Sequence, residues 1–192
     1  MTSGLMKEQT AESSPALMAR IAGVFYVLNI VTSIFAFFDK SSPRLAFVCG
    51  LLATACYITV TILFYYLFKP VNRGLSLIAA FFSMAGSTVG VLSSLHINIF
   101  HINLLVFFGF YCLLIGYLIL KSTFLPKILG VLMVFAGLGW LTFISSSLAK
   151  FLNPYNMVPG GVGEGLLTLW ILIMGVNAQR WKEQANAAGQ RQ

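Results

Sequence analysis

Three side chains in this chain stand out as candidates for chemistry: His96, His101 and Glu164. Two imidazoles and a carboxylate can together bind a divalent metal such as zinc. The spacing between the histidines does not place them on one helical face, so a metal site would depend on three separate segments meeting. The simpler interpretation, which we favour, is a first-turn carboxylate at a helix N-terminus and two hydrated loop histidines. Whether the chain binds a metal ion therefore stays open.

Sequence patterns typical of known enzymes are missing. There is no H-E-x-x-H, G-x-S-x-G or Walker loop, and no intramembrane pair of acids of the kind an aspartyl protease needs. Haem ligation would require histidines that project into a helical core, whereas His96 and His101 fall together at one predicted helix end. We predict no cofactor, and the chain is more typical of a protein without catalytic activity.

The composition excludes an ordinary soluble domain. Apolar residues make up 58% of the 192 residues and charged residues only 9%, against about 25% charged in soluble domains. The net charge of +7 does not indicate nucleic-acid binding, because the basic residues lie at the ends of apolar runs rather than on one face. Membrane lipids are the expected partners.

The apolar runs predict an all-α fold, a six-span transmembrane helical bundle. We expect a flexible N-terminal tail over 1–15, a membrane domain over 16–181 and a flexible C-terminal tail over 182–192. The connection 150–163 is rich in Pro and Gly and is expected to be irregular. The predicted spans are 21–38, 45–68, 75–95, 102–120, 128–148 and 164–178.

Charge predicts the orientation and small residues predict the packing. Nine of the twelve Lys and Arg residues fall on the side of the two termini, which places the N and C termini in the cytoplasm by the positive-inside rule. Gly86 and Gly90 form a GxxxG pair, which predicts close helix packing inside the bundle. The same pair leaves a homo-oligomer or another membrane-protein partner open.

Polar side chains at membrane depth are the remaining candidates for a site. Asn29, Asn103 and Tyr111 are expected to face the bundle interior, and for Asn29 a helix-to-helix hydrogen bond is the simplest role. With Glu164 assigned to a helix end, no span holds an ionisable group at mid-depth. This argues against proton-coupled or sodium-coupled transport.

Several segments together form a recognisable pattern: Arg20-Ile21-Ala22-Gly23, Lys69–Leu77, Gly116–Ile119, Phe124–Leu132, and Gly163-Glu164 with Leu169-Trp170. These segments resemble a bacterial family of six-helix membrane proteins that is known only as a domain of unknown function. The resemblance implies six spans in a bacterial cytoplasmic membrane but no activity. It also implies a histidine two residues after Gly109, where this chain has Tyr111.

These observations predict a multi-pass integral membrane protein with a structural, accessory or ligand-binding role. A small uncoupled permease or channel is the alternative. A dry core of apolar contacts would favour the first prediction, and a polar path through the bundle would favour the second.

Overall fold

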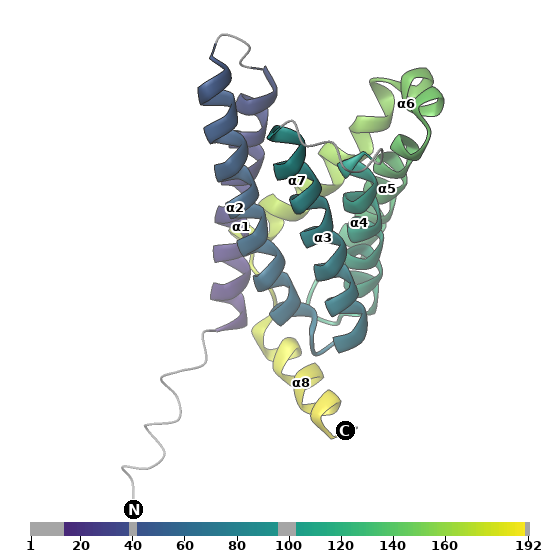
Figure 1. Cartoon of the computed structure of the whole chain (residues 1–192). Coiled ribbons are helices and arrows are strands. Elements are labelled where there is room, and N and C mark those ends of the chain that lie inside the picture. The colour runs from purple at the N-terminus through teal and green to yellow at the C-terminus, as the bar shows by residue number, and fades with distance from the viewer. Residues whose placement is uncertain (1–13, 39–41, 96–102, 191–192) are drawn as a thin grey trace, which may run out of the picture.

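The computed structural model describes residues 14–38, 42–95 and 103–190, and within them the chain is helical (Figure 1). The long helices are α1 (Pro15–Phe38), α2 (Pro43–Phe68), α3 (Arg73–Ser94), α4 (Leu104–Lys121), α5 (Lys127–Leu141) and α7 (Val158–Ile173). Shorter elements follow α5 and α7: η1 (Thr142–Ile144), α6 (Ser146–Leu152), η2 (Tyr155–Met157) and α8 (Ala178–Gly189).

Side chains at the helix starts explain where α2, α3 and α4 begin. Ser42, Asn72 and Asn103 each accept a hydrogen bond from a backbone N–H of the first turn. Such caps satisfy donors that have no partner within the helix. Pro43 occupies the first position of α2, where its missing N–H costs nothing.

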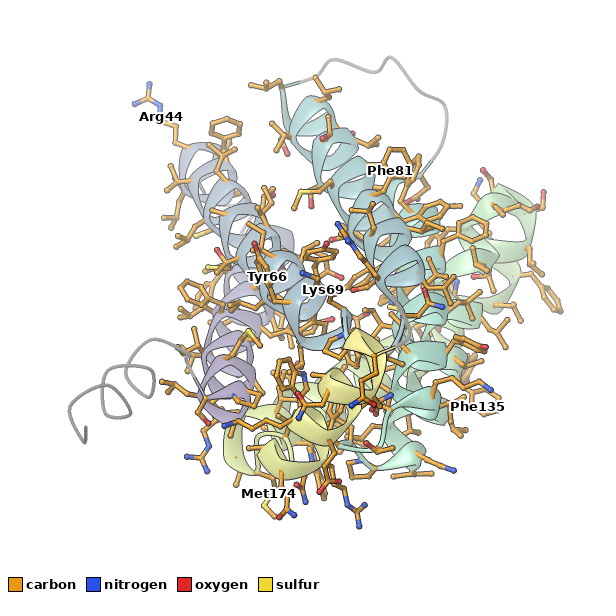
Figure 2. All side chains as sticks on the ribbon, turned by 90° about the horizontal axis from the view of Figure 1, so that it is seen from below. Arg44, Tyr66, Lys69, Phe81, Phe135 and Met174 are labelled. Atoms are coloured by element: carbon orange, nitrogen blue, oxygen red, sulfur yellow. The ribbon has the colours of Figure 1, made fainter. Side chains whose placement is uncertain are left out.

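Within the described ranges six helices are long and apolar enough to cross a membrane, which confirms the predicted fold class. Their outward side chains are apolar: Phe81, Phe135 and Met174, labelled in Figure 2, keep 67%, 56% and 61% of their surface exposed. Large exposed apolar side chains would be unfavourable in water and are suited to lipid.

The six long helices form a closed ring. The packed neighbours are α1 with α2, α2 with α3, α3 with α4, α4 with α5, α5 with α7, and α7 with α1. The start of α1 and the whole of α8 lie at one end of this ring, and α6 lies at the other (Figure 1). Buried aromatic and aliphatic side chains fill its interior, among them Tyr26, Phe64 and Met133.

The contact between α4 and α5 is made by glycines. A side-chain carbon at Gly116 would lie 2.8 Å from the carbonyl oxygen of Gly130, and one at Gly137 would lie 2.8 Å from that of Gly109. Only glycine permits backbones to approach so closely. In lipid, where association depends on packing, this approach holds the pair together.

The predicted Gly86 and Gly90 pair is half correct. A carbon at Gly86 would lie 3.1 Å from Phe107 Cβ, so Gly86 does face α4. Gly90 has no other residue within 4 Å of such a carbon, so it does not contact a neighbouring helix. The GxxxG spacing alone does not place both of its glycines against a neighbouring helix.

The connection 150–163 and the C-terminal tail differ from the prediction. Helix α7 begins at Val158, because Pro159 is tolerated in a first helical turn and Gly160 and Gly163 pack closely against α5. The segment 182–192 is not a flexible tail throughout, since α8 continues to Gly189. Trp181 Nε1 donates to the carbonyl of Leu67 at 2.8 Å and fixes α8 to the bundle.

We predict that Gly116→Leu lowers the free energy of unfolding by about 1–3 kcal/mol, because the new side chain would collide with α5. Gly90→Leu is the matched control and should leave stability nearly unchanged, since the space beside Gly90 is open. Thermal unfolding in detergent measures both. Equal losses for the two variants would contradict this account of the packing.

Candidate functional site

Glu164 lies well inside a membrane-spanning helix. It is six residues beyond Val158, about 9 Å along the axis of α7 at 1.5 Å per residue, and its side chain is partly buried. The first turn of α7 holds no acidic residue. The prediction that Glu164 complements a helix N-terminus is therefore wrong, as is the statement that no span carries an ionisable group at mid-depth.

Three donors from three other helices hold the Glu164 carboxyl group. The Tyr26 hydroxyl of α1 donates to Oε2 at 2.7 Å, and the indole Nε1 of Trp140 on α5 donates to Oε1 at 2.6 Å. The Cys112 thiol of α4 lies 3.7 Å from Oε1, a weaker contact. We call Glu164, Tyr26, Cys112 and Trp140 the Glu164 cluster.

Aromatic rings surround this cluster on its inner side. Tyr57 of α2 stands edge-on to Tyr26 and Tyr111, with ring centroids 5.6 Å and 5.8 Å apart. Tyr57 also meets Phe108 at 5.0 Å. Edge-to-face pairs of this kind contribute about 0.5–1.5 kcal/mol each beyond the burial of their area, so the rings form a packed aromatic wall.

Glycines on both sides of α7 allow Glu164 to reach its partners. A carbon at Gly23 would lie 2.8 Å from the Leu172 backbone, and one at Gly163 would lie 2.6 Å from the carbonyl oxygen of Leu132. Gly160 lies one turn before Glu164, and its missing side chain leaves room for the Trp140 indole. Close contact with α1 and α5 thus brings their donors within hydrogen-bonding distance.

The carboxyl group has no cationic partner in the described ranges. All three neighbours are neutral donors, and both carboxyl oxygens act as acceptors. A charge inside a membrane is costly unless it is paired or hydrogen-bonded. The cluster satisfies the hydrogen bonds but leaves the charge of a carboxylate uncompensated.

The other predicted site residues fall in different places. His96 and His101 lie outside the described residues. Asn29 Nδ2 donates to the carbonyl oxygen of Ala53 at 3.0 Å, which joins α1 to α2. Asn103 accepts from Leu105 N as the cap of α4, so it has a local role at a helix end.

Tyr111 is brought to the site. Its side chain is 1% exposed, and its hydroxyl has no hydrogen-bond partner among the described residues. Thr168, one turn after Glu164, also has an unpartnered buried hydroxyl in this part of the chain. Within the described ranges no three His, Cys, Asp or Glu side chains lie close enough to share a metal ion.

Comparison with known proteins shows the family of this chain. The model of a domain of unknown function, DUF4386, matches residues 38–98 and 86–175. The chain belongs to this family. It is also 29% identical over 127 residues to an uncharacterized protein of Archaeoglobus fulgidus, covering 62% of this chain and 76% of that protein. No solved structure matches the chain.

Sequence reasoning missed Tyr26, Trp140 and Cys112 as partners of Glu164. None of the three belongs to a motif that the sequence analysis could connect with Glu164. One signal could have found the site: if the Gly-rich segment around Glu164 is taken as helix, this acid stands at mid-span among apolar residues. The identity of its donors depended on how the helices pack.

We predict that Tyr26→Phe lowers the free energy of unfolding by about 1–3 kcal/mol, because it leaves Oε2 of the partly buried Glu164 without its donor. Tyr111→Phe removes a hydroxyl that has no described partner, so its effect should be near zero or slightly stabilising. Denaturant titration in detergent compares the two variants. A larger loss for Tyr111→Phe would refute the assignment of Tyr26 as the donor.

Proposed function

We propose that this multi-pass membrane protein binds a small organic cation beside Glu164. The observation that carries the proposal is a partly exposed, mid-span carboxyl group whose partners in the described ranges are neutral and which is backed by tyrosine rings. A bound cation would compensate the carboxylate charge in a medium where that charge is otherwise costly.

The surroundings favour an organic cation over a metal ion. Hard cations such as Ca²⁺ take six to eight oxygen ligands, whereas the Glu164 cluster offers one carboxylate, one phenol oxygen and a thiol. Aromatic faces attract quaternary and protonated amines, with about 0.5–2 kcal/mol for each well-placed ring. The partly exposed indole of Trp140 supplies such a ring beside Glu164, and the buried rings of Tyr26, Tyr57 and Tyr111 lie behind it.

Entry of a ligand requires one donor to give way. The Cys112 thiol is the weakest of the three, because sulfur is a poor donor and its contact is the longest at 3.7 Å. The side chains of Glu164 and Trp140 are partly exposed, while those of Tyr26 and Tyr111 are buried. A ligand would therefore approach on the Glu164 and Trp140 side.

A permease is the second candidate, favoured by the mid-depth position of Glu164. Coupled transporters depend on ionisable groups at this depth. The described core is nevertheless dominated by dry contacts such as Phe64, Ile115, Met133 and Leu167. This packing supports a binding role more than a standing channel.

The test is tryptophan fluorescence during titration with tetramethylammonium, tetraethylammonium or tetraphenylphosphonium. We expect a saturable change, because Trp140 touches the site. Glu164→Gln should weaken binding by about tenfold or more, as expected for loss of an ion pair of at least ~1.4 kcal/mol. Glu183→Gln is the matched control, since Glu183 is an exposed glutamate on α8.

Two results would count against the proposal. One is a folded Glu164→Gln protein that binds these cations as well as the wild type does. The other is a wild type with no saturable response to any of them. Glu164 would then be a purely structural hydrogen-bonding centre.

We further propose that both termini face the cytoplasm and that the membrane is the cytoplasmic membrane of a bacterium. The excess of Lys and Arg at the α8 end supports the orientation. The family resemblance supports a bacterial source, although the Archaeoglobus fulgidus relative indicates that similar chains also occur in archaea.

Labelling with a membrane-impermeant maleimide tests this orientation. The background would lack Cys49, Cys56 and Cys112, with one new cysteine at exposed Lys150 on α6 or at exposed Arg73 at the start of α3. In intact cells only Lys150→Cys should react, and Arg73→Cys should react after lysis. The reverse pattern would invert the proposed topology.

A further inference from the structure

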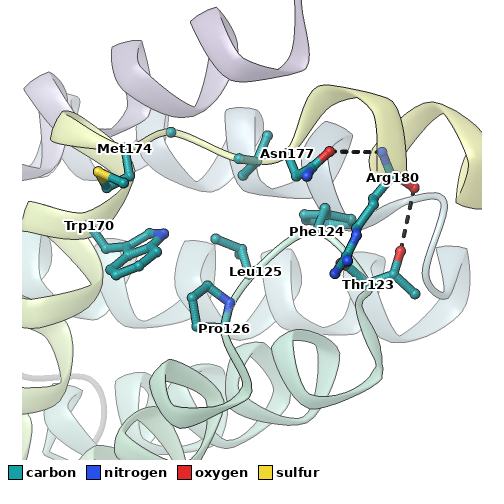
Figure 3. Close-up of a pocket in the computed structure, with 10 residues that line it drawn as sticks. Thr123, Phe124, Leu125, Pro126, Trp170, Met174, Asn177 and Arg180 are labelled. Carbon is teal, nitrogen blue, oxygen red and sulfur yellow. Dashed lines mark hydrogen bonds between the residues drawn. The ribbon is translucent and has the colours of Figure 1, made fainter.

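A pocket lies at the α8 end of the bundle, and none of its lining residues belongs to the Glu164 cluster. Ten residues line a pocket of 380 Å³ between the turn 122–126, the C-terminal turns of α7 and the first turn of α8 (Figure 3). Its wall is chemically divided: Trp170, Met174 and Leu125 stand on one part, and Thr123, Asn177 and Arg180 on another.

The polar part of the pocket is held rigidly. Asn177 caps α8 by accepting from Arg180 N at 3.0 Å, and Thr123 Oγ1 donates to the Arg180 carbonyl at 3.4 Å (Figure 3). Gln184 Oε1 accepts from the Thr123 backbone N–H at 3.0 Å. These bonds lock α8 to the turn 122–126 and fix where Arg180 can reach.

Arg180 has spare capacity for a ligand. Its guanidinium carries five N–H donors, and its single described hydrogen bond is a long one, 3.4 Å from Nη1 to the Thr123 carbonyl oxygen. The guanidinium also sits in the first turn of α8, where the helix dipole favours an anion over a cation. An anion bound here would be stabilised by the charge of the guanidinium and by the dipole of α8.

Other positive charges lie near the pocket, and among the described residues no acid lines it. Lys127 directly follows the lining residue Pro126, and Arg20 Nε lies 3.6 Å from where a carbon on the lining residue Gly175 would stand. Among the described residues only Glu164 and Glu183 are acidic. Neither belongs to the lining, and Glu183 accepts from Gln179 at 3.1 Å.

The apolar part of the pocket faces the lipid. Met174 is 61% exposed and lies at the periphery of the bundle in the view from below (Figure 2). The pocket sits where the fifth span begins at Lys127 and the sixth ends at Ile173, which is the level of lipid headgroups. Trp170 beside it is the type of residue that gathers at this level.

We propose that this pocket binds the headgroup of an anionic phospholipid. The phosphate would meet Arg180, with Arg20 and Lys127 adding to the positive potential, and the start of the acyl chains would lie along Trp170 and Met174. Guanidinium groups bind phosphate through paired, charge-assisted hydrogen bonds. The site needs neither Glu164 nor a ligand beside it.

Native mass spectrometry of the detergent-solubilised protein tests the proposal with dioleoylphosphatidylglycerol and dioleoylphosphatidylcholine. The wild type should retain the anionic lipid in preference to the zwitterionic one. Arg180→Gln should weaken retention of phosphatidylglycerol about tenfold, as for loss of one charge-assisted pair. Lys182→Gln should change it less than about twofold, because Lys182 carries the same charge on α8 but does not line the pocket.

Three further results decide the matter. Arg180→Lys should retain part of the preference, which separates loss of charge from loss of fold. Equal weakening by Arg180→Gln and Lys182→Gln would overturn the site in favour of diffuse attraction to the membrane surface. The third result is a protein that retains neither lipid but binds glycerol 3-phosphate at millimolar concentration in a way that depends on Arg180. It would overturn the lipid as occupant and assign the pocket to soluble phosphates.

Discussion

A carboxyl group in the middle of a membrane span constrains this fold more than any other feature. Lipid offers no hydrogen bonds, and the cost of an acid at mid-depth runs to several kcal/mol. Glu164 therefore has to find its donors within the protein, and it finds Tyr26, Trp140 and Cys112 on three different helices. The hydrogen bonds of this one side chain can form only because α1, α4, α5 and α7 pack closely together.

Glycine is what makes this condition attainable. Gly23 and Gly163 bring α1 and α5 against the backbone of α7, and Gly160 makes room for the Trp140 ring. In a soluble helix these residues would cost stability through backbone entropy. In lipid the gain from close packing offsets that cost, which explains why a segment that looks like a loop in sequence folds as a helix.

The sequence was informative about spans and less so about the site. Composition and the apolar runs predict six helices, because each run must match the thickness of the bilayer. The charge pattern cannot reveal that Glu164 meets Tyr26, since 138 residues separate them. The glycine spacing of α3 predicted a packing face at Gly90 that does not exist, because spacing alone does not specify which side of a helix meets a neighbour.

Tyr111 shows how the chemistry of this site depends on one position. The family resemblance implies a histidine here, and the structure places this residue in the ring of aromatics around Tyr57, beside the Glu164 cluster. An imidazole can take up a proton and supply a positive charge to a nearby acid. A phenol cannot, so in this chain the wall beside Glu164 stays neutral. The described neighbours of Glu164 therefore supply no positive charge, and this is the observation from which we propose a cationic ligand.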